Sequence, residues 1–155
     1  YEVSNHAVPG EEARHNLLYW RYGDFLGLGA GAHGRLTLGG QKFATIAAAL
    51  PTEWLKRVEA NDNGGISFEE IDAETQAIEM VLMGIRLKEG LPLAELEQRT
   101  GYLINAECIE NQIRDGLLAR WQRQGNAQLL RPTAKGVEVL NYLAGQLVEG
   151  LQPVS

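Results

Sequence analysis

Hydrophobic and polar positions in the second half of the chain follow the period of amphipathic helices. Residues 67–70 fit a capping box, in which the Ser67 hydroxyl accepts a backbone N–H and Glu70 reaches back to the cap. The apolar residues that follow fall on one helical stripe, which ends at Glu89-Gly90. These stripe residues are Phe68, Ile71, Ile78, Val81, Leu82 and Ile85. The pattern predicts one long helix over residues 67–89.

Shorter elements follow this helix. Leu93 to Thr100 has helical spacing and is closed by Gly101, and Asn105 is placed to cap another helix, so the pair predicts a helix-turn-helix. Two apolar runs on either side of residues 124–126 predict a β-hairpin. Thr133 then caps a last helix that runs past Leu147. This order is typical of a winged-helix-like domain.

The first 60 residues give mixed signals. Residues 1–5 alternate like a strand and do not begin with methionine, so we expect the chain to be the C-terminal piece of a longer protein. Residues 15–20 fit a helix or a strand, and in either case His15 and Tyr19 share a face. Residues 22–38 are rich in glycine and predict a strand with a turn, and Thr52 begins a short helix.

Five consecutive turn-forming residues at 61–65 separate the two halves. We therefore expect an α+β fold with two domains, one over residues 1–60 and a mainly helical one over residues 61–155.

Composition narrows the class of protein. The chain has 155 residues, 45% of them hydrophobic, and a net charge of −6. Acidic residues also outnumber basic ones on the candidate recognition helix after Asn105, so we expect no nucleic-acid partner. The single cysteine, Cys108, excludes an intrachain disulfide and favours the cytoplasm. No apolar run is long enough to predict a transmembrane segment.

Two motifs resemble ligand sites but fail in detail. Residues 29–34 satisfy the dinucleotide pattern G-x-G-x-x-G, yet the residues that follow do not predict a helix whose N-terminus could hold a pyrophosphate. Residues 59–70 match several positions of a calcium-binding loop, but Glu59 stands where an aspartate is expected. We expect a linker that runs into a helix cap there, and calcium binding stays the less favoured alternative.

Histidine, aromatic residues and glycine are concentrated over residues 15–34. A flat apolar ligand needs aromatic walls, an iron atom within it accepts an imidazole, and glycines let the backbone approach a ligand closely. His15, Tyr19 and Trp20 are therefore candidates for a binding wall. His6 and His33 have no second ligand at a diagnostic spacing.

A family resemblance covers nearly the whole chain. The chain resembles the end of the radical-SAM barrel in heme chaperones of the HemW family, which are similar to oxygen-independent coproporphyrinogen III oxidase. The segments that carry the resemblance are Tyr1-Glu2-Val3-Ser4-Asn5, Arg14-His15-Asn16-Leu17 with Tyr19-Trp20, Gly27 to His33, Met83 to Gly90, and Gly116 to Gly136. Residues 15–20, here called the HNxxYW element, are the most specific part.

The resemblance implies a function and a site. It implies that the HNxxYW element contacts heme through His15, Asn16, Tyr19 and Trp20, with His15 as the iron ligand. It also implies a weaker site at the glycine segment, whose candidate residues are Gly29, Gly31 and His33. Residues 1–60 would form the edge of the barrel, and the partners would be heme or a porphyrin and a protein that receives heme.

The family's radical chemistry needs a [4Fe–4S] cluster and S-adenosylmethionine. Three cysteines hold that cluster in relatives, and this chain has one, so no radical reaction is assigned to these residues and no catalytic residue is named. Two alternatives stay open: part of a coproporphyrinogen III oxidase, or a protein-docking module that binds no tetrapyrrole.

Overall fold

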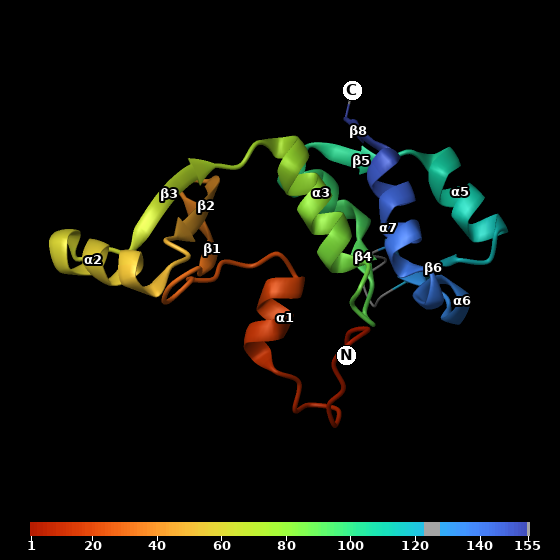
Figure 1. Cartoon of the computed structure of the whole chain (residues 1–155). Coiled ribbons are helices and arrows are strands. Elements are labelled where there is room, and N and C mark those ends of the chain that lie inside the picture. The colour runs from red at the N-terminus through yellow and green to blue at the C-terminus, as the bar shows by residue number, and fades with distance from the viewer. Residues whose placement is uncertain (123–127, 155) are drawn as a thin grey trace. The chain divides into compact units, whose positions relative to one another are not determined.

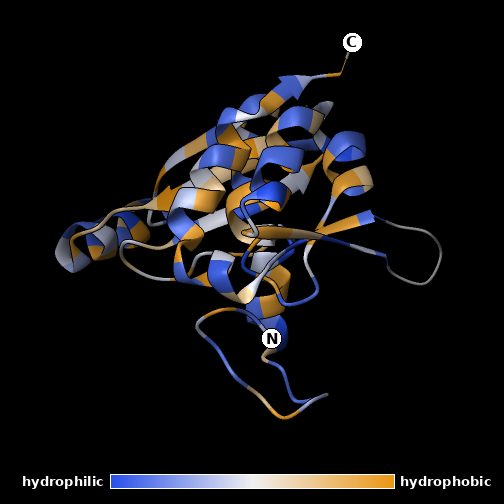
Figure 2. Cartoon of the chain, turned by 90° about the vertical axis from the view of Figure 1, so that its right-hand side faces the viewer, coloured by the Kyte–Doolittle hydropathy of each residue, from blue (hydrophilic) through white to orange (hydrophobic). Residues whose placement is uncertain are grey.

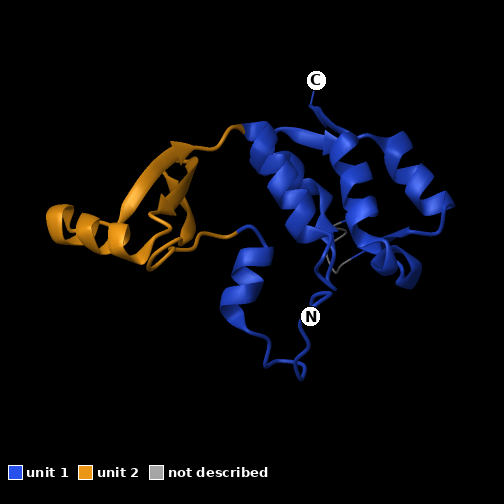
Figure 3. Cartoon of the chain, viewed as in Figure 1, with its two compact units in different colours: residues 1–22, 73–155 blue, residues 23–72 orange. Residues whose placement is uncertain are grey.

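A computed structural model of the chain describes residues 1–122 and 128–154 (Figure 1). The fold is α+β, as expected. It divides into two compact units: the first unit consists of Tyr1–Tyr22 and Ala73–Ser155, and the second unit of Gly23–Asp72 (Figure 3).

This division differs from the expected boundary at residue 60. Residues 1–22 belong with the C-terminal unit because their backbone is tied to the turn after residue 84. The amide of Val3 donates to the carbonyl of Arg86 at 3.2 Å, and the amide of Lys88 donates to the carbonyl of Tyr1 at 3.0 Å. Only an isolated bridge between Glu2 and Leu87 stands where residues 1–5 predicted a strand.

The first unit surrounds one hydrophobic core. Its helices are α1 (Arg14–Trp20), α3 (Ala73–Gly84), α4 (Leu93–Thr100), α5 (Ala106–Arg114), α6 (Ala134–Glu138) and α7 (Leu140–Glu149). Its strands are β4 (Leu91–Pro92), β6 (Leu118–Gln122) and β7 (Gln128–Pro132) in the order β4-β7-β6, and the pair β5 (Tyr102–Ile104) and β8 (Leu151–Pro153). Each helix carries hydrophobic and hydrophilic residues (Figure 2), and Val81, Leu96 and Leu147 are fully buried.

Capping signals define the short helices of this unit as predicted. The Asn105 side chain accepts hydrogen bonds from the amides of Glu107 and Cys108 and so begins α5. Gly101 has a left-handed φ of 69° and ends α4. The Thr133 hydroxyl accepts from the amide of Gly136 and begins α6. The strands β6 and β7 confirm the predicted hairpin, whose turn at 124–126 lies outside the described residues.

The second unit is a three-stranded antiparallel sheet and one helix. The sheet order is β1 (His33–Leu38), β2 (Gln41–Ala47) and β3 (Gly65–Glu70), and α2 (Pro51–Asn61) joins β2 to β3. Gly39 and Gly40, both with positive φ, form the two-residue turn between β1 and β2. On the sheet, the rings of Phe43 and Phe68 stack at 4.8 Å.

Two helix predictions were wrong. Residues 67–70 are not a helix cap but part of β3, because pairing with β2 satisfies their backbone groups, and the helix α3 begins only at Ala73 and ends at Gly84. The last helix is broken in two at Val139, whose ψ of 31° ends α6 before α7 begins. No helix among the described residues is long and apolar enough to cross a membrane.

Candidate functional site

The HNxxYW element forms the helix α1, which resolves the choice between helix and strand. His15, Leu18 and Tyr19 are exposed on one face, with exposed fractions of 47% for Leu18 and 37% for Tyr19. Residues four apart on a helix are neighbours, so His15 and Tyr19 share this face. Among the described residues, no side chain forms a hydrogen bond or ion pair with the His15 imidazole. This face is therefore available to a ligand.

The opposite side of α1 is held by other parts of the first unit. The Asn16 side chain donates to the Tyr1 hydroxyl at 3.1 Å. The Arg86 guanidinium lies 5.0 Å from the centroid of the half-buried Trp20 ring, a cation–π distance. The Trp20 ring also meets the Tyr19 ring edge to face, with centroids 5.0 Å apart and planes at 78°. Asn16 and Trp20 thus support the helix while His15 and Tyr19 face outward.

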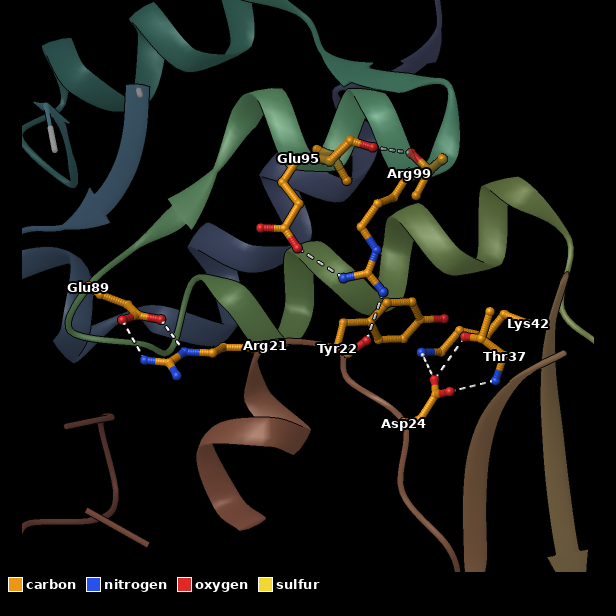
Figure 4. A network of polar contacts seen from close by, with 10 residues as sticks. Arg21, Tyr22, Asp24, Thr37, Lys42, Glu89, Glu95 and Arg99 are labelled. Atoms are coloured by element: carbon orange, nitrogen blue, oxygen red, sulfur yellow. Dashed lines mark hydrogen bonds and ion pairs between the residues drawn. The ribbon is translucent and has the colours of Figure 1, made fainter. Parts of the chain in front are cut away.

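The C-terminal end of α1 is fixed by polar contacts (Figure 4). Arg21 donates two hydrogen bonds to Glu89, at 2.6 and 2.8 Å, and this pairing raises the pKa of Arg21. Tyr22 has a left-handed φ of 56°, and its carbonyl accepts a 2.9 Å hydrogen bond from Arg99. These contacts tie Arg21 to the turn before β4 and Tyr22 to α4.

A cavity of about 560 Å³ opens beside this end of α1 within the first unit. Buried Met80, Leu87 and Leu91 line it, and Trp20 forms part of its wall. Its size falls in the range of small-molecule pockets, and its wall is partly polar, because Arg21, Glu89 and Glu95 also line it. His15 and Tyr19 do not line it, so it is distinct from the exposed face of α1.

The glycine segment lies in the second unit. Gly29 and Gly31 have φ values of 98° and 70°, which side chains rarely adopt, and they turn the chain into β1. Gly27 packs so closely that a methyl group there would overlap the backbone of His33. His33 itself is exposed at the start of β1. As expected, the G-x-G-x-x-G pattern does not lead into a helix, because its last two residues already belong to the strand β1.

A polar network organises the entry to the second unit. The Asp24 carboxylate accepts hydrogen bonds from the amide and hydroxyl of Thr37, both at 2.8 Å, and from the Lys42 ammonium at 3.0 Å (Figure 4). Burial raises the pKa of Asp24, but the bonds from Lys42 and Thr37 outweigh it and leave the pKa below its ordinary value. The Lys42 side chain is 3% exposed, so this carboxylate compensates a buried charge.

The candidate site residues therefore fall into two groups. The first unit brings together His15, Asn16, Tyr19 and Trp20 on α1, and the second unit holds Gly29, Gly31 and His33.

The described residues contain no group of three or more His, Cys, Asp or Glu side chains that could hold a metal ion. Residues 59–70 run from α2 into β3, so they do not form the loop between two helices that a calcium hand requires. Cys108, whose thiol donates to the Gln146 carbonyl at 3.2 Å, cannot alone supply the three thiolates of an iron–sulfur cluster.

Comparison with known proteins confirms the resemblance to the HemW and HemN proteins. Residues 71–139 match the model of the HemN C-terminal domain family. The chain is 36% identical over 127 residues to the heme chaperone HemW of Mycobacterium tuberculosis (strain CDC 1551 / Oshkosh), covering 76% of the chain and 28% of that protein. It is 31% identical over 162 residues to the mouse mitochondrial radical S-adenosyl methionine domain-containing protein 1, covering 98% of the chain and 36% of that protein.

A solved structure has the same fold. The match is to the coproporphyrinogen III oxidase HemN of Escherichia coli, a radical SAM enzyme, with a TM-score of 0.56 and 16% identity over 81% of this chain and 28% of that chain. At this identity the match shows the fold alone. The chain spans only about a third of these relatives, and the activity of a whole protein is therefore a proposal.

Sequence reasoning missed the residues that hold α1 in place. Arg86 and Glu89 belong to a segment that carried the family resemblance, but nothing in their spacing predicts a contact with Trp20 or Arg21. Their presence in that segment was the only signal that could have singled them out.

Proposed function

We propose that this chain is the C-terminal part of a radical-SAM protein that binds heme and delivers it to a recipient protein. The observation that carries the proposal is the exposed face of α1, which His15 and Tyr19 share and on which the imidazole has no hydrogen-bond or ion-pair partner among the residues that the structure describes. Neutral imidazole is a common iron ligand, and the Tyr19 ring supplies an aromatic contact for a porphyrin. The relatives named heme chaperones support this function.

Charge on α1 also suits heme. Arg14 is exposed at the first residue of α1, next to His15. A guanidinium there can pair with a propionate carboxylate of heme. Heme is the cargo in this proposal, and His15, Tyr19 and Arg14 supply its axial ligand, its ring contact and its counter-charge.

The architecture of the intact protein is part of the proposal. Residues 23–72, with Gly29, Gly31 and His33, would form an edge of the radical-SAM barrel, and α4, α5 and the β6–β7 hairpin would serve as a winged-helix-like docking domain for the recipient. The cluster and S-adenosylmethionine would bind outside this chain. We propose the cytoplasm as the location, although one relative's name places it in mitochondria.

Hemin titration tests heme binding by this chain. We expect His15→Ala to weaken hemin binding at least about tenfold, which corresponds to about 1.4 kcal/mol. His6→Ala is the matched control, because His6 is also an exposed histidine of the first unit and lies outside α1. Equal affinity of the two variants would contradict the site, and failure of the unaltered chain to bind any tetrapyrrole would favour a plain docking module.

Coproporphyrinogen III oxidation is the alternative activity of the intact protein. It rests on the likeness to HemN, which at 16% identity concerns the fold. Product formation by the intact protein under anaerobic conditions would establish it.

A further inference from the structure

The Trp20 ring is held by a residue that comes from the HemN C-terminal domain. Arg86 lies within the matched residues 71–139, in the turn after α3, and its guanidinium carbon is 5.0 Å from the Trp20 ring centroid. Its side chain is 28% exposed. Trp20 in turn meets the Tyr19 ring edge to face. A change at Arg86 therefore reaches the exposed face of α1 through two ring contacts.

Arg86 is itself anchored by the segment at residues 2–5. The Glu2 side chain is fully buried, and its Oε2 lies 3.8 Å from Nε of Arg86. The other carboxylate oxygen of Glu2 accepts a hydrogen bond from Asn5, and Nη2 of Arg86 donates to the Ser4 hydroxyl at 3.0 Å. A buried carboxylate is stable only beside a compensating charge. Glu2 Oε2 and Arg86 Nε are both buried and form no hydrogen bond, so the guanidinium compensates the buried carboxylate by its charge alone.

We propose that Arg86, anchored by the buried Glu2, is the positioning residue that fixes the Trp20 indole, and through it the Tyr19 ring, in the orientation that binds a tetrapyrrole. The inference rests on the proposed function of α1. Arg86 acts through Trp20 and does not contact the ligand.

Indole resonances of the ligand-free chain test the positioning step without any tetrapyrrole. The chain has three tryptophans, so a 15N-labelled sample gives three indole N–H signals, which Trp→Phe variants assign. We expect Arg86→Gln to shift the Trp20 signal and to leave Trp54 unchanged. Arg131→Gln is the matched control, because Arg131 lies 4.6 Å from the Trp121 ring centroid and should shift only that signal. An unchanged Trp20 signal in folded Arg86→Gln would overturn the proposal.

Binding of hemin and of metal-free protoporphyrin IX tests the consequence. We expect Arg86→Gln to weaken both about threefold to tenfold, within the range of a partly desolvated cation–π contact, and Arg131→Gln to weaken neither. In a Trp20→Phe background the effect of Arg86→Gln should shrink, because the ring that Arg86 positions has been altered. The same loss in both backgrounds would mean that Arg86 contacts the ligand directly and would overturn the positioning role.

A conservative variant provides a second test if Arg86→Gln does not fold. Arg86→Lys retains a positive charge for Glu2 but lacks the planar guanidinium over Trp20. We expect it to fold, to shift the Trp20 signal and to bind more weakly than the unaltered chain. If the unaltered chain binds no tetrapyrrole, the proposed function fails, whereas an unshifted Trp20 signal refutes the positioning role alone.

Discussion

Arg21 and Glu89 form a bidentate pair in which Nε and Nη2 of the guanidinium donate to the two carboxylate oxygens at 2.6 and 2.8 Å. The pair joins the residue after Trp20 to the turn before β4. It thereby joins the HNxxYW element to the residues that match the HemN C-terminal domain model, by a contact with defined geometry.

Glu89→Gln should lower the free energy of unfolding of the first unit by about 0.5–1 kcal/mol, a small effect because the Arg21 side chain is 51% exposed. The loss should shrink in 1 M salt, which screens the pair in the unaltered chain. Urea unfolding at low and high salt measures both values. Glu95→Gln, which removes an i,i+4 pair with Arg99 in the same unit, is the control. An effect of Glu89→Gln no larger than in this control would contradict the structural role.

Asp24 should make the second unit sensitive to acid. Because its folded-state pKa lies below the ordinary value, the carboxylate contributes stability at neutral pH, and this contribution is lost as the pH falls from about 4 through the folded pKa. Asp24→Asn should cost about 0.5–1.5 kcal/mol at pH 7 and much less at pH 3. Protection of the β1 and β2 amides from hydrogen exchange reports both values. An equal cost at the two pH values would refute the network's role.

Gly136 should not tolerate a side chain. A methyl group at this position of α6 would overlap the Leu117 carbonyl oxygen, whereas one at Gly145 of α7 would meet nothing within 4 Å. We expect Gly136→Ala to lower the free energy of unfolding by about 2 kcal/mol or more, and Gly145→Ala to raise it by about 0.5–1 kcal/mol. Thermal unfolding of the two variants measures both changes in stability. Similar changes at Gly136 and Gly145 would contradict the close packing of Gly136 against Leu117.

The Cys108 thiol should react slowly. Burial, and then the nearby charge of Glu149, raise its pKa, so the thiolate is scarce at pH 8. The rate of alkylation by iodoacetamide should be lower than that of a cysteine in an unstructured peptide, and Glu149→Gln should increase it. A rate equal to that of the peptide would show that the thiol is not shielded.

The sequence predicted the elements that carry strong local signals. A few adjacent residues were enough to predict the helix cap at Asn105, the helix end at Gly101 and the hairpin that leads to Pro132. The structure confirms all three. Residues 67–70 carry an equally strong cap signal and still form a strand. There the ladder with β2 supplies the hydrogen bonds that a helix would have supplied, and no local pattern contains that partner.

The candidate site was predictable only in part. The shared face of His15 and Tyr19 follows from their spacing, but its exposure depends on Asn16 and Trp20 being held by Tyr1 and Arg86, which are distant in sequence. The assignment of Gly29, Gly31 and His33 to the same site came from family resemblance. It stays a prediction, because these residues belong to the other unit.

The proposed heme site requires an iron–imidazole bond at His15. Resonance Raman spectroscopy of the ferrous heme complex of this chain detects the iron–histidine stretching band directly. We predict that band in the unaltered chain and in His6→Ala, and its loss in His15→Ala. A band that persists in His15→Ala would place the heme iron on another ligand and contradict the proposed site.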